Sequence, residues 1–310
     1  MKNILIVGAS GLIGKHLIQL CLSLKWSITT FSYSNKKTAY PINQLPWNPK
    51  FIISDENINL ELVNAMNEAD VVINMAGSTV AKGRLGKKVK DSVLQSRIEA
   101  TSALVRLFNQ VENKDKVWIQ MSGSSFYGSQ ADNEITETTT SAGNLFLADV
   151  SKAWEGAVDP IRDQVKRLII LRMGLVIAKD SPAFQRIILP ILLFSGGPLA
   201  SGKQYWPWVH VDDVVHGMAY LIEHDSANGI FNIGSPNPET QLNFTKIVGK
   251  AYKRPVLFPN LPAWFLRLVA GNAINELVMP SQRMLPKHLL DIGYKFKYPN
   301  LKKALEKIRE

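Results

Sequence analysis

Three glycines near the amino terminus have a spacing that could hold a phosphate. The stretch "NILIVGASGLIGKHL" places them directly after an apolar run and before an amphipathic segment. Glycine at these points permits a tight turn, lets backbone N–H groups approach a pyrophosphate and lets the following helix pack on the strand. The pattern in this strand-to-helix context predicts a dinucleotide site. The residues expected around it are Gly8, Ser10, Gly11, Leu12, Ile13 and Gly14.

The segment after the second expected strand bears on the choice between NAD(H) and NADP(H). An NAD site typically carries a carboxylate about twenty residues beyond the glycines, where it accepts hydrogen bonds from the ribose hydroxyls. Here residues 1–54 contain six lysines and no acidic residue. Hydroxyl and lysine side chains suit a 2'-phosphate, so NADP(H) is predicted over NAD(H), and the alternative is that the lysines are only solvated. The residues expected near the phosphate are Ser32, Tyr33, Ser34, Lys36 and Lys37.

Two later segments supply small and hydroxyl side chains at expected strand ends. "ADVVINMAG" places Asn74, Ala76 and Gly77 after one strand, and "VWIQMSGSSFYG" places three serines after the next. Small residues at the carboxyl ends of central strands leave room for a cofactor, and a hydroxyl there could donate to a substrate oxygen. We expect Ser122 to join the cofactor-binding residues.

The elements that must position these residues alternate along the chain. Continuous apolar runs predict strands at 4–7, 27–31, 51–54, 71–75, 117–121 and 168–173, and apolar spacing near 3.6 predicts helices at 11–24, 60–67, 87–111 and 146–158. Strands separated by helices imply a parallel sheet, so the predicted fold class is α/β, a Rossmann-type doubly wound sheet.

The alternation breaks down after about residue 178, where prolines and glycines punctuate the chain. We therefore expect residues 1–177, completed by about 206–234, to form the dinucleotide-binding domain. Residues 178–205 and 235–310 are expected to form a smaller C-terminal substrate-binding lobe. Within the completing segment, Asp212 and Asp213 are expected to cap a helix that begins near Val214, and His210 is expected to be structural.

The composition of the 310 residues is that of a globular protein, with 46% hydrophobic residues and a net charge of +10. No apolar run is long enough to cross a bilayer, and the one cysteine has no metal-ligand companions. No basic run is interleaved with aromatic residues. We expect a cytoplasmic protein with a small-molecule substrate, no metal, no membrane partner and no nucleic-acid partner.

The chain resembles the extended short-chain dehydrogenase/reductase superfamily. The resemblance rests on the glycine pattern, "NMAG", "RMGLVIA", "GGPLASGKQYWPWVHVDDV", "FNIGSPNP" and "QRMLPKHLLDIGYKFKYPNLKKAL". More narrowly, these segments are similar to epimerase family proteins of the sugar-nucleotide epimerase type, which end in a small C-terminal domain. The resemblance implies an NAD(P)-binding domain, a small substrate that includes nucleotide-linked compounds, and a homodimer through the helices at 87–111 and 146–158.

The resemblance also implies a catalytic set that this chain lacks in part. Active members use a Ser or Thr after the fifth strand, a Tyr acid or base, and a Lys four residues later. Ser124 is the best match for the serine, with Ser122 and Ser125 as alternatives. Leu147 and Ser151 stand at the Tyr and Lys positions, and a lysine one residue late, at 152, is rotated about 100° around a helix.

Other groups are candidates for the missing chemistry. Tyr127 is a candidate proton donor, with packing against the lobe as the alternative. Arg172 is expected at the cofactor or at an anionic substrate group, with pairing to a local carboxylate as the alternative. Two functions follow: an NADP(H)-dependent oxidoreductase or epimerase with a non-standard proton donor, or a dinucleotide-binding sensor or scaffold without turnover.

Overall fold

The computed structural model describes residues 1–33, 38–54, 59–80, 85–256 and 259–310. Within them, a seven-stranded sheet has the order β11-β7-β5-β4-β1-β2-β3, and all neighbours pair in parallel. The prediction of a doubly wound α/β fold is confirmed. The strands are β1 (Asn3–Val7), β2 (Ser27–Ser32), β3 (Asn43–Pro46), β4 (Val71–Asn74), β5 (Val117–Gly123), β7 (Arg167–Met173) and β11 (Gly229–Ile233).

The strand order reverses between β1 and β4. The chain proceeds from β1 through β2 to β3 on one side, and from β4 through β5 and β7 to β11 on the other. In an open α/β sheet the ligand crevice lies outside the carboxyl ends of the strands at this switch point. The fold therefore brings the ends of β1, β4 and β5 to the edge where a dinucleotide would bind.

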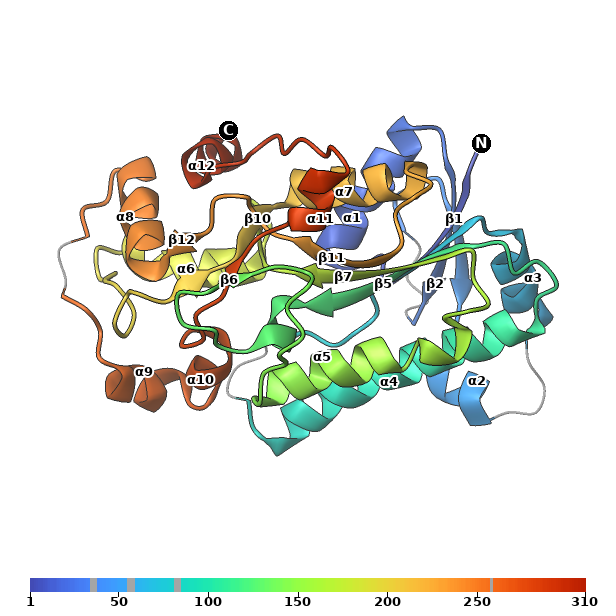
Figure 1. Cartoon of the computed structure of the whole chain (residues 1–310), viewed down its shortest axis with the longest axis horizontal. Helices are drawn as coiled ribbons and strands as arrows, with labels where there is room; N and C mark the ends of the chain where they lie inside the picture. Colours follow the sequence, from blue (N-terminus) through green and yellow to red (C-terminus); the bar gives the residue numbers. More distant parts are fainter. Residues whose placement is uncertain (34–37, 55–58, 81–84, 257–258) are drawn as a thin grey trace.

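Helices cover both faces of the sheet (Figure 1). Helices α1 (Leu12–Ser23) and α7 (Val211–Glu223) lie on one face, and α3 (Leu60–Glu68), α4 (Lys87–Gln110) and α5 (Phe146–Gly156) lie on the other. Successive strand residues point to opposite faces, so Leu5 and Ile6 enter two separate core clusters. This double burial explains why the central strands are continuously apolar.

The predicted strand at 51–54 is wrong. These residues form the end of helix α2 (Pro49–Ser54), and the edge strand β3 comes earlier. Pro49 suits the first turn of a helix. Phe51 is 68% exposed while Ile52 is buried, so only one side of the run faces the protein. A short apolar run does not distinguish a strand from a helix segment by periodicity.

The C-terminal region has its own apolar cluster, which includes Phe184, Trp208, Phe244 and Leu305. Short strand pairs and helices surround this cluster, and Figure 1 shows most of them beyond the carboxyl ends of the main sheet. The further elements are β6 (Glu134–Ile135), β8 (Leu175–Ile177), α6 (Pro182–Leu192), β9 (Tyr205–Trp206), β10 (Trp208–His210), β12 (Glu239–Thr240), α8 (Gln241–Ala251), α9 (Ala263–Ala270), α10 (Ala273–Leu277), β13 (Arg283–Met284), α11 (Lys287–Asp291) and α12 (Leu301–Arg309), with 3-10 turns η1 (Ser124–Tyr127) and η2 (Asp159–Ile161).

Helix α7 begins earlier than predicted and has a different cap. Its N-cap is His210, whose Nδ1 accepts a hydrogen bond from the Asp212 backbone N–H at 3.2 Å. The Asp213 carboxylate instead accepts the backbone N–H groups of Lys297 and Tyr298 at 2.6 and 2.9 Å, which anchors the C-terminal segment. The expectation of a structural His210 is confirmed, and the expectation of aspartate caps is wrong.

None of the helices in the described ranges is both long and apolar enough to cross a membrane.

Candidate functional site

The glycine turn closes tightly on the rest of the sheet. Gly8 has φ +89°, and a Cβ on it would lie 2.6 Å from the carbonyl carbon of Met75 at the end of β4. A Cβ on Gly14 would lie 2.4 Å from the backbone oxygen of Ala9. Both positions require glycine, because any side chain would collide with the backbone. The turn thus has the close packing that the sequence predicts.

The amino terminus of α1 is open to an anion. Its N-cap is Gly11, no side chain caps it, and no acidic residue lies in the first turn. The first N–H groups of a helix have no intrahelical acceptor, so those of Leu12, Ile13 and Gly14 are free to bind a negative group. Ser10 and Gly11 are exposed beside them. The turn fits the pyrophosphate of a dinucleotide, because the exposed Gly11 carries no side chain and the helix that follows it has no side-chain cap.

Asn74 shapes the neighbouring loop from inside the protein. It is fully buried, and its side-chain amide donates to Thr101 Oγ1 and Gln120 Oε1 at 2.9 and 3.0 Å. Its Oδ1 accepts the Ala76 backbone N–H at 3.2 Å. The structure therefore places Asn74 behind the site, where it holds the turn that carries Ala76 and Gly77 at the crevice edge.

Arg97 of α4 is a residue that the sequence reasoning missed. A Cβ on Gly77 would lie 2.9 Å from Arg97 Cζ, and Nη1 donates to the carbonyls of Ser78 and Val93 at 3.0 and 2.8 Å. The guanidinium lies 4.7 Å from the centroid of the Trp154 ring. Burial lowers the pKa of Arg97 to about 10, so it keeps its positive charge at neutral pH. No local motif marks it.

The candidate 2'-phosphate residues are described only in part. Ser32 is the last residue of β2, and Tyr33 is 70% exposed just beyond it. Ser34, Lys36 and Lys37 lie outside the described residues. The choice between NADP(H) and NAD(H) therefore stays a prediction from the sequence.

Ser122 and Arg172 are joined by the half-buried carboxylate of Glu155. Ser122 Oγ donates to Glu155 Oε1 at 2.6 Å, and Arg172 Nε and Nη2 donate to the two Glu155 oxygens at 2.9 and 2.8 Å. Arg172 also lies 3.4 Å from the Phe126 ring centroid. Although burial acts against the charge, the Glu155 carboxylate raises the pKa of Arg172. For both residues the structure supports a structural role instead of contact with a cofactor.

The two predicted catalytic residues are engaged within the protein. Ser124 Oγ donates to Gln282 Oε1 at 2.8 Å, and the Gln282 amide donates to the backbone oxygens of Ser124 and Gly128. Tyr127 is fully buried, and its hydroxyl donates to Asn232 Oδ1 at 2.8 Å. Burial raises the pKa of Tyr127, against the effect of the nearby Arg172 charge. The structure thus favours packing for Tyr127 over proton transfer, and it gives Ser124 the role of an anchor for the C-terminal segment.

The alternative serine, Ser125, is the better candidate for substrate contact. It is half-buried, and within the described part of the chain its Oγ has no hydrogen-bond partner. A Cβ on Gly123 would lie 4.0 Å from Ser125 Oγ and 3.7 Å from Ser151 Oγ, so both hydroxyls flank the end of β5. Ser151 itself donates to the Leu147 carbonyl at 3.0 Å.

Lys152 lies away from this edge, as the helical spacing predicts. Its Nζ is 2.7 Å from Asp149 Oδ1, and its side chain is 42% exposed. Leu147 and Ser151 are buried on the inner side of α5. Across the described ranges, no group of three or more His, Cys, Asp or Glu side chains is placed to hold a metal ion.

Comparisons with known proteins agree with this arrangement. The model of the NAD dependent epimerase/dehydratase family matches residues 4–234. The chain belongs to this family. A second model, a domain of unknown function named DUF1731, matches residues 261–308 of the epimerase-family chain.

Full-length relatives carry the same family description. The chain is 31% identical over 309 residues to an epimerase family protein of Staphylococcus epidermidis, covering 99% of this chain and 98% of the relative. It is 32% identical over 307 residues to one of Staphylococcus saprophyticus, with 99% of each covered. The crystal structure of human epimerase family protein SDR39U1 (isoform 2) with NADPH is similar with a TM-score of 0.85 and 25% identity, covering 99% of this chain and 98% of that one.

Proposed function

We propose that this epimerase-family protein binds NADP(H) and uses it in an oxidoreductase or epimerase reaction on a small substrate, nucleotide-linked compounds being one class. The observation that carries the proposal is the amino terminus of α1, which has no side-chain cap at Gly11 and no acidic residue in its first turn. Gly8 and Gly14 allow the tight turn that leads into this helix. The acid-free segment 1–54 supports the phosphorylated cofactor. So does the similarity, at 25% identity over nearly the whole chain, to a human protein whose structure was solved with NADPH.

In this proposal the residues at the crevice edge have different roles. A bound nicotinamide supplies a hydride donor or acceptor. The α1 amino terminus binds and orients the phosphates, and the turn at Ala76 and Gly77, which Asn74 holds, lies beside them. Ser125 is the hydroxyl placed to donate a hydrogen bond to a substrate oxygen, and Arg97 adds a fixed positive charge at the same edge. Since Leu147 cannot transfer a proton, the proton comes from the substrate's own groups or from water.

Cofactor titration tests the first half of the proposal. NADPH is expected to bind the full-length protein at least about tenfold more tightly than NADH, because the extra phosphate meets lysine and hydroxyl groups without an opposing carboxylate. Isothermal titration calorimetry measures both affinities. Tighter binding of NADH would overturn the choice of cofactor. Failure of both to bind below about 1 mM would overturn the dinucleotide function.

Hydride transfer tests the second half. Stereospecifically deuterated NADPH, incubated with a panel of carbonyl compounds, is expected to lose label with the wild-type protein. The Ser125→Ala variant should lose it about 10- to 100-fold more slowly. The control is Ser122→Ala, whose hydroxyl is bound to Glu155. Equal rates in wild type and Ser125→Ala would overturn the role given to Ser125.

A sensor or scaffold function is the second candidate. It is favoured by the apolar Leu147 at the proton-transfer position and by the engaged hydroxyls of Ser124 and Tyr127. Under this alternative NADPH binds with unchanged affinity while label stays on the cofactor with every carbonyl compound. That combination of results would replace the enzymatic proposal.

A further inference from the structure

A groove lies in the C-terminal region, between helix α6, the end of α8 and the end of α12. Its volume is about 550 Å³, within the range of small-molecule sites. Phe184, Ile188 and Ile308 line it as buried side chains, and Leu189 lines it with 52% of its surface exposed. These residues are separate from the glycine turn and from the ends of β4 and β5. The groove thus offers an apolar surface that the proposed cofactor does not use.

The charged residues that line the groove are both positive. They are Lys179, which precedes α6, and Arg309, at the end of α12, and no Asp or Glu is among the described residues that line it. The Arg309 guanidinium lies 5.8 Å from the centroid of the Tyr252 ring. In the described part of the chain, the Tyr252 hydroxyl has no hydrogen-bond partner. The lining of the apolar groove therefore includes a guanidinium that lies over a tyrosine ring.

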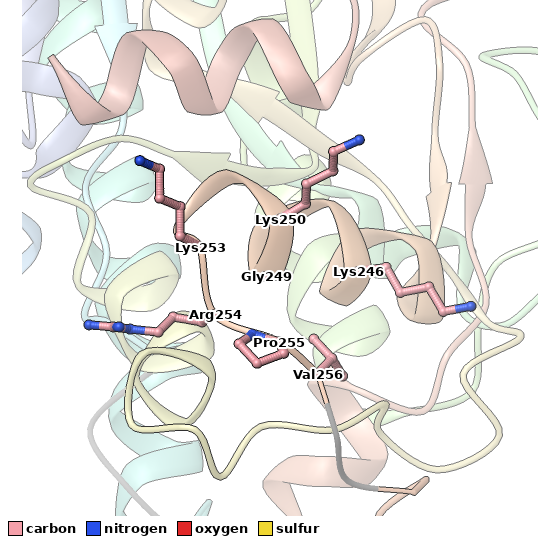
Figure 2. Close-up of a pocket in the computed structure, with 7 residues that line it drawn as sticks. All are labelled: Lys246, Gly249, Lys250, Lys253, Arg254, Pro255 and Val256. Atoms are coloured by element: carbon pink, nitrogen blue, oxygen red, sulfur yellow. The ribbon is translucent and has the colours of Figure 1, made fainter.

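A second pocket, lined by residues near Tyr252 in the chain, is also positively charged. It has a volume of about 320 Å³, and the described residues that line it include four cations and no acidic residue (Figure 2). Figure 2 shows Lys246 and Lys250 projecting to one side and Lys253 and Arg254 to the other. Because these side chains diverge, the second pocket does not form a convergent anion site. It adds positive charge on both sides of Tyr252 in the chain, and positive charge favours negative ligands.

We propose that the groove binds a single-chain amphiphilic anion, an acyl chain with a carboxylate head group. The chain lies along the accessible surface of Leu189 and Leu192, above the buried Phe184 and Ile188, and the carboxylate is bound by Arg309. Burial of the CH₂ groups supplies affinity, and the positive residues select anions over neutral or cationic chains. Neither the family description nor the proposed reaction requires this site.

Calorimetric titration of the full-length protein with dodecanoate, kept below its micelle concentration, tests the proposal. Dodecanoate is expected to bind with one-to-one stoichiometry, and dodecanol and dodecyltrimethylammonium about tenfold more weakly. Leu189→Glu puts a carboxylate in the groove and should weaken dodecanoate at least about tenfold, and Arg309→Gln about fivefold. Because Leu189 is half exposed, the first variant should fold, and a thermal melt checks this.

The matched control is Leu268→Glu on α9, where the leucine is 67% exposed and does not line the groove. It should leave dodecanoate affinity within about twofold of wild type. The proposal is overturned by absence of dodecanoate binding up to about 1 mM, by equal affinity for the cationic amphiphile, or by equal loss in Leu189→Glu and Leu268→Glu. NADPH affinity, measured in the same samples, stays unchanged in all three variants if the site is separate from the crevice.

Discussion

The amino termini of helices α1 and α5 differ in what binds their first N–H groups. That of α1 begins at Gly11 with no side-chain cap, and its first N–H groups face the crevice. That of α5 begins at Leu145, also without a cap of its own, but Glu276 from α10 reaches it. The Glu276 oxygens accept the backbone N–H groups of Phe146 and Leu147 at 3.2 and 3.0 Å. The amino termini of both helices attract negative charge. At α5 the Glu276 carboxylate supplies it, whereas the N–H groups of α1 stay available to a ligand.

The attraction of a helix amino terminus for negative charge can serve ligand binding at α1, and at α5 it joins two parts of the chain. Glu276 lies 130 residues after Phe146, so its contact ties the C-terminal region to α5. Helix α5 carries Leu147 and Ser151, the residues that stand at the Tyr and Lys positions implied by the family resemblance. The Glu276 carboxylate therefore fixes the start of a helix that lacks the Tyr and Lys of the family resemblance. At the α1 end no acidic residue lies in the first turn, and no side chain of the described residues caps the helix.

Closing the open end should have the largest effect. Gly14→Ala places a Cβ 2.4 Å from the Ala9 oxygen and forces the turn to move. NADPH affinity is expected to fall at least about 100-fold, since the amides lose their common direction. Gly86→Ala is the matched control, because a Cβ there meets nothing within 4 Å. Calorimetry gives the affinities and circular dichroism checks the fold; a folded Gly14→Ala that binds normally would contradict the phosphate role of the turn.

A third amino terminus, that of α7, adds a dependence on pH. Its cap is the neutral ring of His210, which is 4% exposed. Burial lowers the pKa of His210 from 6.5 to about 4, and His16, Lys297 and Lys307 act in the same direction, while Asp212 opposes them. The unfolded chain takes up this proton as the pH falls through about 6.5, and the folded chain takes it up only near 4. Stability should therefore be full at pH 7 and fall between these values.

For the His210 group alone the expected loss is about 2 kcal/mol on going from pH 7 to pH 5. His210→Asn keeps a capping side chain and removes the titrating ring. Urea unfolding of both proteins at the two pH values isolates the contribution of the histidine from that of the carboxylates. The same loss of stability in both proteins would show that His210 does not titrate as its burial implies.

Emptying the α5 end should have a smaller effect. Glu276→Ala is expected to cost about 1 kcal/mol of unfolding free energy and to speed hydrogen exchange of the Phe146 and Leu147 amides. Glu306→Ala is the control, because Glu306 is exposed and makes only a long surface contact of 3.9 Å to Lys302. NADPH affinity should change less than about twofold, since the α1 end is untouched. Unchanged hydrogen exchange at both amides in Glu276→Ala would show that Glu276 does not stabilise the start of α5.

The sequence was sufficient where the chemistry is local. The Gly8 and Gly14 turn and the outward position of Lys152 each depend on residues close together in the chain. The helix at Pro49–Ser54 was missed because a four-residue apolar run fits either type of element. Two alternatives that the sequence left open, packing for Tyr127 and an ion pair for Arg172, are the ones that the structure favours.

Long-range contacts account for what could not be predicted. Gln282 binds Ser124 across 158 residues, and Glu276 reaches α5 across 130. Neither contact leaves a spacing pattern, because each partner is positioned by a different part of the fold. Arg97 likewise gains its place beside Gly77 only when α4 packs under β4. Such residues need the three-dimensional arrangement, and for this reason Ser125 emerges over Ser124 only in the structure.

The smallest effect is expected at Lys152, and it sharpens the contrast between the two sides of α5. Lys152 pairs with Asp149 one turn away on the exposed side, and such surface pairs contribute little. Lys152→Ala should therefore change unfolding free energy by less than about 0.5 kcal/mol, and NADPH affinity by less than about twofold. Label transfer from deuterated NADPH should also persist, whereas Ser125→Ala slows it. A Lys152→Ala protein that binds NADPH but transfers no label would give the displaced lysine a catalytic role, and α5 would have to turn by about 100° to bring it to the crevice.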